Sequence, residues 1–147
     1  MLRRSCVWLV VLLALAGAWP SGQLRADGDR PFRGSAAGMV TGVAPPNELI
    51  IEYTGTATHL GRFTREEHLF LNADGSFTGT MVFTAANGDE LWLDFEGAFS
   101  SATTAEGTYT FTGGTGRFSG ATGGATFEAY TPDGIHVEAR FEGTIRY

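Results

Sequence analysis

The sequence predicts an all-β protein, an eight-stranded antiparallel up-and-down β-barrel built from two similar halves. One pattern occurs twice with the same spacing: Asn87-Gly88 is followed by Phe95-Glu96-Gly97, and Asp133-Gly134 by Phe141-Glu142-Gly143. Nearly every stretch reads as a strand bounded by glycine-containing turns, and no segment has helical periodicity. The repeat favours a barrel over a sandwich, because two halves that close on each other leave no sheet edge to protect.

The first 26 residues are predicted to be a cleavable secretory signal. Arg3 and Arg4 precede an apolar run from Val7 to Trp19, and small residues follow. The run is shorter than the roughly 20 residues that a membrane-spanning helix needs. Cleavage after Ala18 or after Ala26 fits the pattern, and Ala26 is favoured because it leaves a polar region before the cut. We therefore expect a secreted or periplasmic chain, residues 27–147, with no membrane span.

Composition excludes several functional classes. Cys6 is the only cysteine and lies in the predicted signal, so the mature chain has no disulfide and no thiolate nucleophile. All ten cationic residues are arginine, which excludes Schiff-base and P-loop lysines. Loss of Arg3, Arg4 and Arg25 with the signal takes the net charge from −6 to about −9, which is unfavourable for nucleic acid. Residues 27–147 are long enough for one domain.

The first half of the barrel is expected to contain four strands. The second and third are separated by the turn Leu60-Gly61, and the third and fourth by Ala73-Asp74-Gly75. Glycine in the third position of that turn is typical of a three-residue hairpin loop. The predicted strands are Phe32 to Val43, Glu48 to Thr58, Thr64 to Asn72 and Ser76 to Thr84.

The second half is expected to contain four more strands. Ala86-Asn87-Gly88 leads into its first strand, and Pro132-Asp133-Gly134 connects its last two, again as three-residue loops. The latter loop places Glu128 opposite Glu138. The predicted strands are Asp89 to Phe99, Glu106 to Thr112, Thr122 to Thr131 and Ile135 to Arg146.

Three-residue loops preserve the side-chain alternation from one strand to the next, so odd-numbered residues should share one face. That face is apolar from the fourth strand onward, and the even-numbered face carries threonines and charged residues. The odd face is therefore the predicted core. Its members include Phe77, Met81, Phe83, Leu91, Leu93, Phe95, Phe99, Tyr109, Phe111, Phe127, Ile135, Val137, Phe141 and Ile145.

Arg65 and Glu67 are the candidate catalytic residues. Both are odd-numbered, so they are expected to point into one end of the barrel, with Tyr53 and Tyr109 as orienting groups. A carboxylate in an apolar mouth has a raised pKa and can act as an acid or a base. The alternative is that the pair lies in water at the rim, or that a bulge turns it outward.

No metal and no cofactor is expected. His59 is predicted at a turn, and His68 and His136 on the polar face of distant strands, without the spacing of a zinc site. Trp92 is predicted on the polar face, where it packs in an oligomer, stacks on a sugar or has no role.

The run Thr112-Gly113-Gly114-Thr115-Gly116-Arg117-Phe118 resembles a Gly-Gly-Thr-Gly-Lys-Phe segment of plant dirigent proteins, and the allene oxide cyclases are similar in architecture. Residues Ala57 to Thr64 resemble a segment of exported bacterial proteins of the same superfamily. The resemblance implies an eight-stranded barrel of the allene-oxide-cyclase type. It also implies cofactor-free action on small apolar or phenolic molecules inside the barrel, and commonly a trimer.

Three functions remain open from the sequence. The first is an exported barrel without catalytic activity that binds a small apolar molecule in its lumen, with Tyr53, Tyr109, Phe95 and Phe141 as wall residues. The second is a cofactor-free cyclase or isomerase of the allene oxide cyclase type that uses Arg65 and Glu67. The third is a structural or envelope-associated oligomer with a filled lumen. Glycines on the inward face, including Gly79, Gly97 and Gly107, are expected to leave space unless neighbouring large residues fill it.

Overall fold

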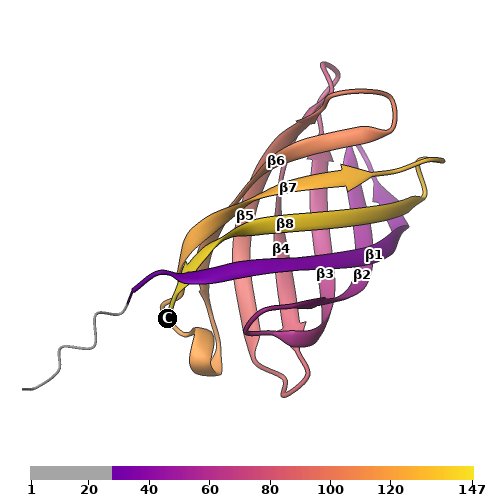
Figure 1. Ribbon diagram of the computed structural model, residues 1–147. Helices are drawn as coiled ribbons and strands as arrows, with labels where there is room; N and C mark the ends of the chain where they lie inside the picture. Colours follow the sequence, from indigo (N-terminus) through magenta and orange to yellow (C-terminus); the bar gives the residue numbers. More distant parts are fainter. Residues whose placement is uncertain (1–27) are drawn as a thin grey trace, which may run out of the picture.

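The computed structural model describes residues 28–147, which form eight strands and one short 3-10 helix. The predicted signal, residues 1–26, lies outside the described residues. Figure 1 shows the elements in chain order. They are β1 (Arg30–Ala44), β2 (Glu48–Ala57), β3 (Gly61–Leu71), β4 (Ser76–Ala85), β5 (Glu90–Phe99), β6 (Thr104–Gly114), η1 (Gly116–Phe118), β7 (Thr122–Tyr130) and β8 (His136–Arg146).

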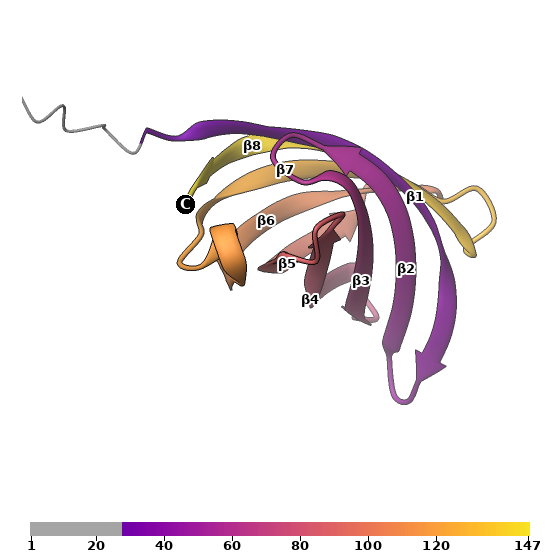
Figure 2. The ribbon, with the colours of Figure 1, turned by 90° about the horizontal axis from the view of Figure 1, so that it is seen from below.

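The strands form one closed barrel, which confirms the predicted fold class. Each strand pairs antiparallel with the next along the chain, and β1 pairs with β8 to close the sheet. Figure 2 shows the strands curving around the barrel, with η1 and the C-terminus at the same end. Closure gives every strand two neighbours, so no sheet edge is exposed.

Odd-numbered residues face the interior from β2 through β8, as the alternation predicted. In β1 the inward residues are even-numbered instead, and Phe32 and Ala36 are buried there. The register between β1 and β2 shifts between Val40 and Gly42, which marks a bulge. The extra residue restores odd parity before the β1–β2 turn.

Two of the three predicted hairpin loops have the expected length, and the third is longer. Tyr130 is the last residue of β7 and pairs with Glu138, and residues 131–135 lie between β7 and β8. The Asp133 carboxylate holds this loop by accepting hydrogen bonds from the backbone N–H groups of Ile135 and His136. The predicted pairing of Glu128 with Glu138 is therefore wrong.

The longer loop moves the β7–β8 register by two residues. Glu128 faces Arg140, an opposite charge, instead of a second carboxylate. Ile135, predicted in the core, lies in the loop and is 51% exposed. A shift of two residues keeps the parity of the strand, so the inward face of β8 is still the predicted one.

The repeated Phe-Glu-Gly sequence has the same packing role in both halves. In β5, Phe95 pairs with Gly79 and Gly97 pairs with Phe77. In β8, the same reciprocal exchange occurs with β1: its pairs are Phe141 with Gly34, and Gly143 with Phe32. The Phe95, Phe77 and Phe141 rings cover the glycines across from them, whereas Gly143 packs against Ala125 of β7. The repeat therefore places a phenylalanine–glycine pair at matching positions in both halves.

The chain ends next to η1, at one end of the barrel (Figure 1). Side chains fill this end. Phe118 of η1 is fully buried, and its ring lies 5.1 Å from that of Tyr147, edge to face. Leu60 in the β2–β3 turn is also buried at this end. The Gly-Gly-Thr-Gly-Arg-Phe segment therefore supplies the plug that closes one end of the barrel.

Candidate functional site

The lumen divides into a packed half and a half that retains a cavity. In the packed half, next to η1, phenylalanine rings contact one another closely. Phe63 and Phe83 have ring centroids 4.8 Å apart, and Phe32 and Phe111 have centroids 4.9 Å apart. Edge-to-face contacts at these distances are typical of solid aromatic cores. A ligand therefore has room only in the other half.

The second half of the lumen contains a cavity of about 100 Å³. Its wall is almost entirely apolar, and it extends from the middle of the barrel to the end with the β1–β2, β3–β4, β5–β6 and β7–β8 turns. We call this end the mouth. The lining residues toward the mouth include Val40, Leu49, Phe99, Ala129, Thr131 and Gly134.

A row of alanines explains why space remains here. Ala105 pairs with Ala129, and Ala129 pairs with Ala139, so three methyl groups lie side by side across β6, β7 and β8. All three line the cavity. Larger side chains at these positions would occupy the space, as the phenylalanines do in the packed half.

Arg65 and Glu67 form the polar floor of this cavity. Both side chains project inward from β3 and are buried, with relative exposures of 3% and 4%. Arg65 Nη2 donates a hydrogen bond of 2.7 Å to Glu67 Oε2. Arg65 Nη1 donates a second one, of 3.0 Å, to the hydroxyl of Tyr109. The expected charged pair is therefore in the lumen, and neither the rim nor the bulge alternative applies.

Aromatic rings hold the guanidinium group in place. The Arg65 Cζ atom lies 3.7 Å from the centroid of the Tyr53 ring and 5.5 Å from that of Phe83. Stacking of this kind stabilises a desolvated cation. Arg65 Nε has no hydrogen-bond partner although it is buried. Arg65 Nε is therefore a buried N–H donor whose hydrogen bond the protein itself does not satisfy.

The buried floor shifts the acid–base properties of its groups. Burial raises the pKa of Glu67 above its ordinary value, and the neighbouring Arg65 charge opposes that shift. Burial also raises the pKa of Tyr109 to about 12. Burial raises the pKa of Tyr53 as well. Both tyrosines are therefore neutral at physiological pH.

The structure brings most of the predicted wall residues together. Tyr53, Tyr109 and Phe95 line the cavity along with Arg65 and Glu67. Phe141 is not among the lining residues, because its ring packs against Phe32 in the other half at a centroid distance of 5.3 Å.

The sequence left open whether inward glycines leave space in the lumen or are filled by large neighbours, and three of them are covered by rings. A Cβ atom on Gly79 would lie 2.5 Å from the Phe95 ring, and one on Gly97 would lie 2.8 Å from Phe77. Phe127 covers Gly107 in the same way. The alanine row, which sequence analysis passed over, provides the space instead. In the sequence, the row is visible only as three odd-numbered alanines, and the strand register is needed to show that they are neighbours.

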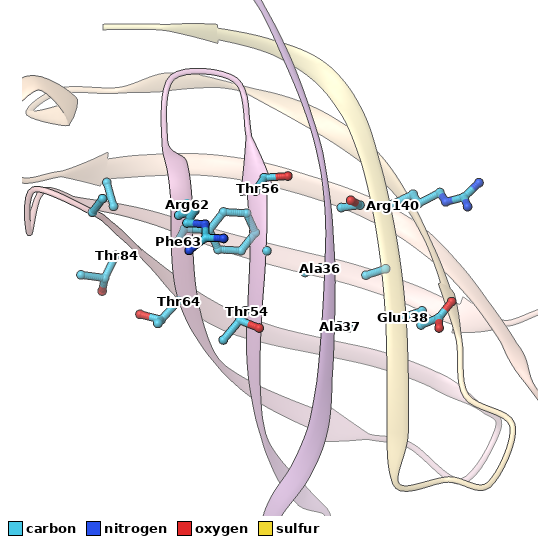
Figure 3. A pocket seen from close by; sticks show the side chains of 15 residues that line it. Ala36, Ala37, Thr54, Thr56, Arg62, Phe63, Thr64, Thr84, Glu138 and Arg140 are labelled. Carbon is cyan, nitrogen blue, oxygen red and sulfur yellow. The ribbon is translucent and has the colours of Figure 1, made fainter.

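A larger hollow lies on the outer wall of the barrel (Figure 3). Small outward side chains, including Ala37, Thr54 and Thr64, form its base, and Arg62 and Arg140 stand at its sides. The base is a solvent-exposed sheet face without an enclosing apolar wall. Ligand sites are concave and mostly apolar, so the lumen is the better candidate.

The histidines form separate contacts on the outside. His68 Nδ1 lies 2.6 Å from Glu48 Oε1, and its Nε2 lies 3.1 Å from Glu66 Oε1. His59, which has a positive φ of 68° in the β2–β3 turn, contacts the hydroxyl of Tyr147 through Nδ1 at 3.0 Å. Within residues 28–147, no group of three or more histidine and carboxylate side chains is arranged to hold a metal ion.

Trp92 is 39% exposed on the outer face of β5, as the alternation predicted. Its indole N–H donates a 2.8 Å hydrogen bond to Glu90 Oε2. None of the helical segments between residues 28 and 147 has the length and apolar character needed to cross a membrane.

No protein-family model matches the chain, and no curated protein matches it. The chain does match solved structures. The pterocarpan synthase dirigent protein GePTS1 matches 82% of this chain over 87% of its own, with 18% identity and a TM-score of 0.51. The pterocarpan synthase dirigent protein PsPTS1 matches 82% of this chain over 96% of its own, with 15% identity and a TM-score of 0.54. The chain therefore has the eight-stranded barrel fold that these dirigent proteins share.

Proposed function

We propose that the protein binds a small apolar molecule in the open half of its barrel lumen, with Arg65 and Glu67 at the floor. The observation that carries this proposal is an apolar cavity with a buried polar floor on which one donor, Arg65 Nε, is unpaired. The solved structures with this fold are described as pterocarpan synthases, which agrees with small-molecule chemistry inside such a barrel.

The size of the cavity limits what enters it. A dry protein cavity of about 150 Å³ holds benzene. The lumen cavity, at about 100 Å³, therefore suits a short alkyl chain, or one aromatic ring after a small movement of the wall. Any remaining part of a longer molecule stays at the mouth.

The floor favours an acceptor atom at the leading end of the ligand. Arg65 has five N–H donors, and two of its nitrogens are engaged by Glu67 and Tyr109. A carbonyl, ether or hydroxyl oxygen near Arg65 Nε would pair the N–H group of that nitrogen, which has no partner within the protein. The Glu67 carboxylate balances the Arg65 charge, so a neutral oxygen suffices.

Native mass spectrometry of the purified protein tests the proposal. A non-covalent adduct, either co-purified or formed with added 3-phenylpropan-1-ol, is expected and should disappear on denaturation. The variant Ala129→Phe places a ring in the cavity and should lose the adduct. Ala98→Phe adds the same ring on the exposed outer face of β5 and should keep it. An adduct that survives in Ala129→Phe contradicts binding in the lumen.

A second candidate function is cofactor-free acid–base catalysis on the bound molecule. The observation that favours it is Glu67, a buried carboxyl with a raised pKa on the wall of the cavity. Glu67→Gln keeps the shape of the side chain and removes its proton chemistry. Unchanged turnover of every bound compound in this variant would exclude a catalytic role for Glu67.

We also propose export, with residues 1–26 removed as a signal. N-terminal sequencing of protein recovered from an exporting host should begin at Asp27.

The trimer that the sequence resemblance implies remains a prediction. Light scattering on the purified protein, measured as it leaves a size-exclusion column, tests it directly. A monomeric mass would contradict it and leave ligand binding in the lumen unaffected.

A further inference from the structure

We infer that the mouth of the cavity selects ligands by charge: it favours apolar molecules whose trailing end carries a positive charge and disfavours anionic ones. This inference rests on the proposed function, since it concerns the same lumen. It comes from the distribution of charged side chains between the two ends of the barrel.

Charged residues are segregated along the barrel axis. The segments that form the mouth, residues 42–50, 70–77, 97–106 and 129–138, contain carboxylates and no arginine. Arginines and carboxylates both occur at the plugged end, which is formed by residues 28–33, 56–63, 84–91, 112–123 and 144–147. The mouth carboxylates are Glu48, Asp74, Glu106, Asp133 and Glu138, and the arginines of the plugged end are Arg30, Arg33, Arg62, Arg117 and Arg146.

Each mouth carboxylate lies beside the cavity wall. Glu48, Glu106, Asp133 and Glu138 are chain neighbours of lining residues. The fifth, Asp74, is in the β3–β4 loop, where the carbonyl oxygen of Gly75 accepts a 3.0 Å hydrogen bond from the lining residue Phe99. Glu48, Glu106 and Glu138 are even-numbered, so their side chains project from the outer face of the strands at this end. The mouth carboxylates therefore act on an entering molecule through the negative field around this end of the barrel and not by direct contact.

Two histidines are the cationic partners at this end. His68 contacts Glu48 together with Glu66, and His136 Nδ1 lies 2.6 Å from Asp133 Oδ2. Each histidine carries at most one positive charge, so the mouth remains negative even when both are protonated. Glu106, Glu138 and Asp74 have no cationic partner among the ion pairs of the described residues.

The small cavity makes the charge of the trailing end decisive. Because the lumen accepts only one ring or a short chain, the remaining polar end of a ligand stays at the mouth, within the field of the carboxylates around that end. One unit charge about 7 Å from another interacts by roughly 0.6 kcal/mol in water, and several carboxylates add. Salt screens this interaction over a Debye length of about 8 Å at physiological ionic strength.

Three probes with one carbon skeleton test the inference: 3-phenylpropylamine, 3-phenylpropan-1-ol and 3-phenylpropanoate, titrated calorimetrically at neutral pH. At low salt the amine should bind roughly threefold to tenfold more tightly than the alcohol, and the anion more weakly than the alcohol by a similar factor. In 0.5 M salt, about the point where the Debye length falls below 5 Å, the three affinities should converge.

A matched pair of variants separates the mouth from the net charge of the protein. Glu106→Gln with Glu138→Gln removes two exposed mouth charges and should reduce the preference for the amine over the anion by at least threefold. Asp94→Asn with Glu142→Gln removes two exposed charges from the outer wall and should leave that preference unchanged.

Each outcome decides one of the two proposals. If the alcohol binds while the anion binds as tightly as the amine, the charge inference is overturned and the proposed function stands. If the outer-wall variant loses the preference as much as the mouth variant, the net charge is responsible and the inference is again overturned. If none of the probes binds, the proposed function fails and the inference fails with it.

Discussion

Arg65 Nη2 donates a 2.7 Å hydrogen bond to Glu67 Oε2, and both side chains lie on the inward face of one strand within an apolar lumen. Removing two charges from water costs several kcal/mol per ion, and their attraction repays this only with good geometry and further hydrogen bonds. Arg65 Nε lacks such a bond. Apolar residues would serve the fold at least as well, which supports the proposed ligand site in the lumen.

The first prediction concerns the stability of variants in this pair. Glu67→Leu leaves the Arg65 charge buried without its partner and should lower the free energy of unfolding by about 3 to 5 kcal/mol. The double variant Arg65→Met with Glu67→Leu should be within about 1 kcal/mol of the natural protein, or more stable. Urea denaturation measures both. A double variant as unstable as the sum of its two single variants would show that the fold requires the pair.

The second prediction concerns pH. Because the pKa of Glu67 is raised in the folded protein, the folded state binds more protons than the unfolded state above the ordinary value of 4.5. The contribution of Glu67 to the free energy of unfolding should therefore decrease as pH rises from 4.5 through the raised pKa. Denaturation of the natural protein and of Glu67→Gln over pH 4 to 8 isolates this contribution. A difference that grows with pH would mean a lowered pKa.

The third prediction concerns the plug. Gly116 has a φ of +56°, and a Cβ atom there would lie 2.1 Å from Asp89 Oδ1. Gly120 has a φ of +74° with open space around it. Gly120→Ala should cost about 1 kcal/mol from the left-handed backbone alone, whereas Gly116→Ala should cost more because Asp89 must also move. Equal costs in thermal denaturation would show that the contact with Asp89 is not restrictive.

The fourth prediction concerns His68 on the outer face. Hydrogen bonds that His68 donates to the carboxylates of Glu48 and Glu66 raise the pKa of His68 above 6.5. Their stabilising effect should be complete below pH 6.5 and should be lost as pH rises through the raised pKa. Glu48→Gln should lower the pKa of His68 in an NMR titration, while Glu138→Gln should leave it unchanged. An unaltered pKa in Glu48→Gln would argue against the 2.6 Å contact in solution.

The fold was predictable because alternation and turn chemistry point the same way along the chain. Glycine in the third position correctly marked the loops ending at Gly75 and Gly88, and the odd face correctly placed Arg65 and Glu67 inside. Strand parity decides which way a side chain points, and parity depends on loop length and on bulges within a strand, such as the one in β1. This is why a two-residue error at the loop containing Gly134 changed the register but not the inward face.

The shape of the lumen was not predictable in the same way. Whether Gly79 leaves a hole depends on which residue faces it in the next strand, and Phe95 fills it. Conversely, Ala105, Ala129 and Ala139 leave space only because the register aligns them. Cross-strand pairing decides both results, and the sequence pattern alone specifies neither.

Methyl NMR of the methionines tests ligand binding in the lumen most directly. Met81 is 2% exposed and lines the cavity, whereas Met39 is 44% exposed on the outside of β1, so the two methyl groups serve as probe and control. Titration with 3-phenylpropan-1-ol should shift the Met81 methyl signal saturably and leave that of Met39 in place. A Met81 signal that does not move over the titration, or a shift confined to Met39, would contradict a ligand site in the lumen.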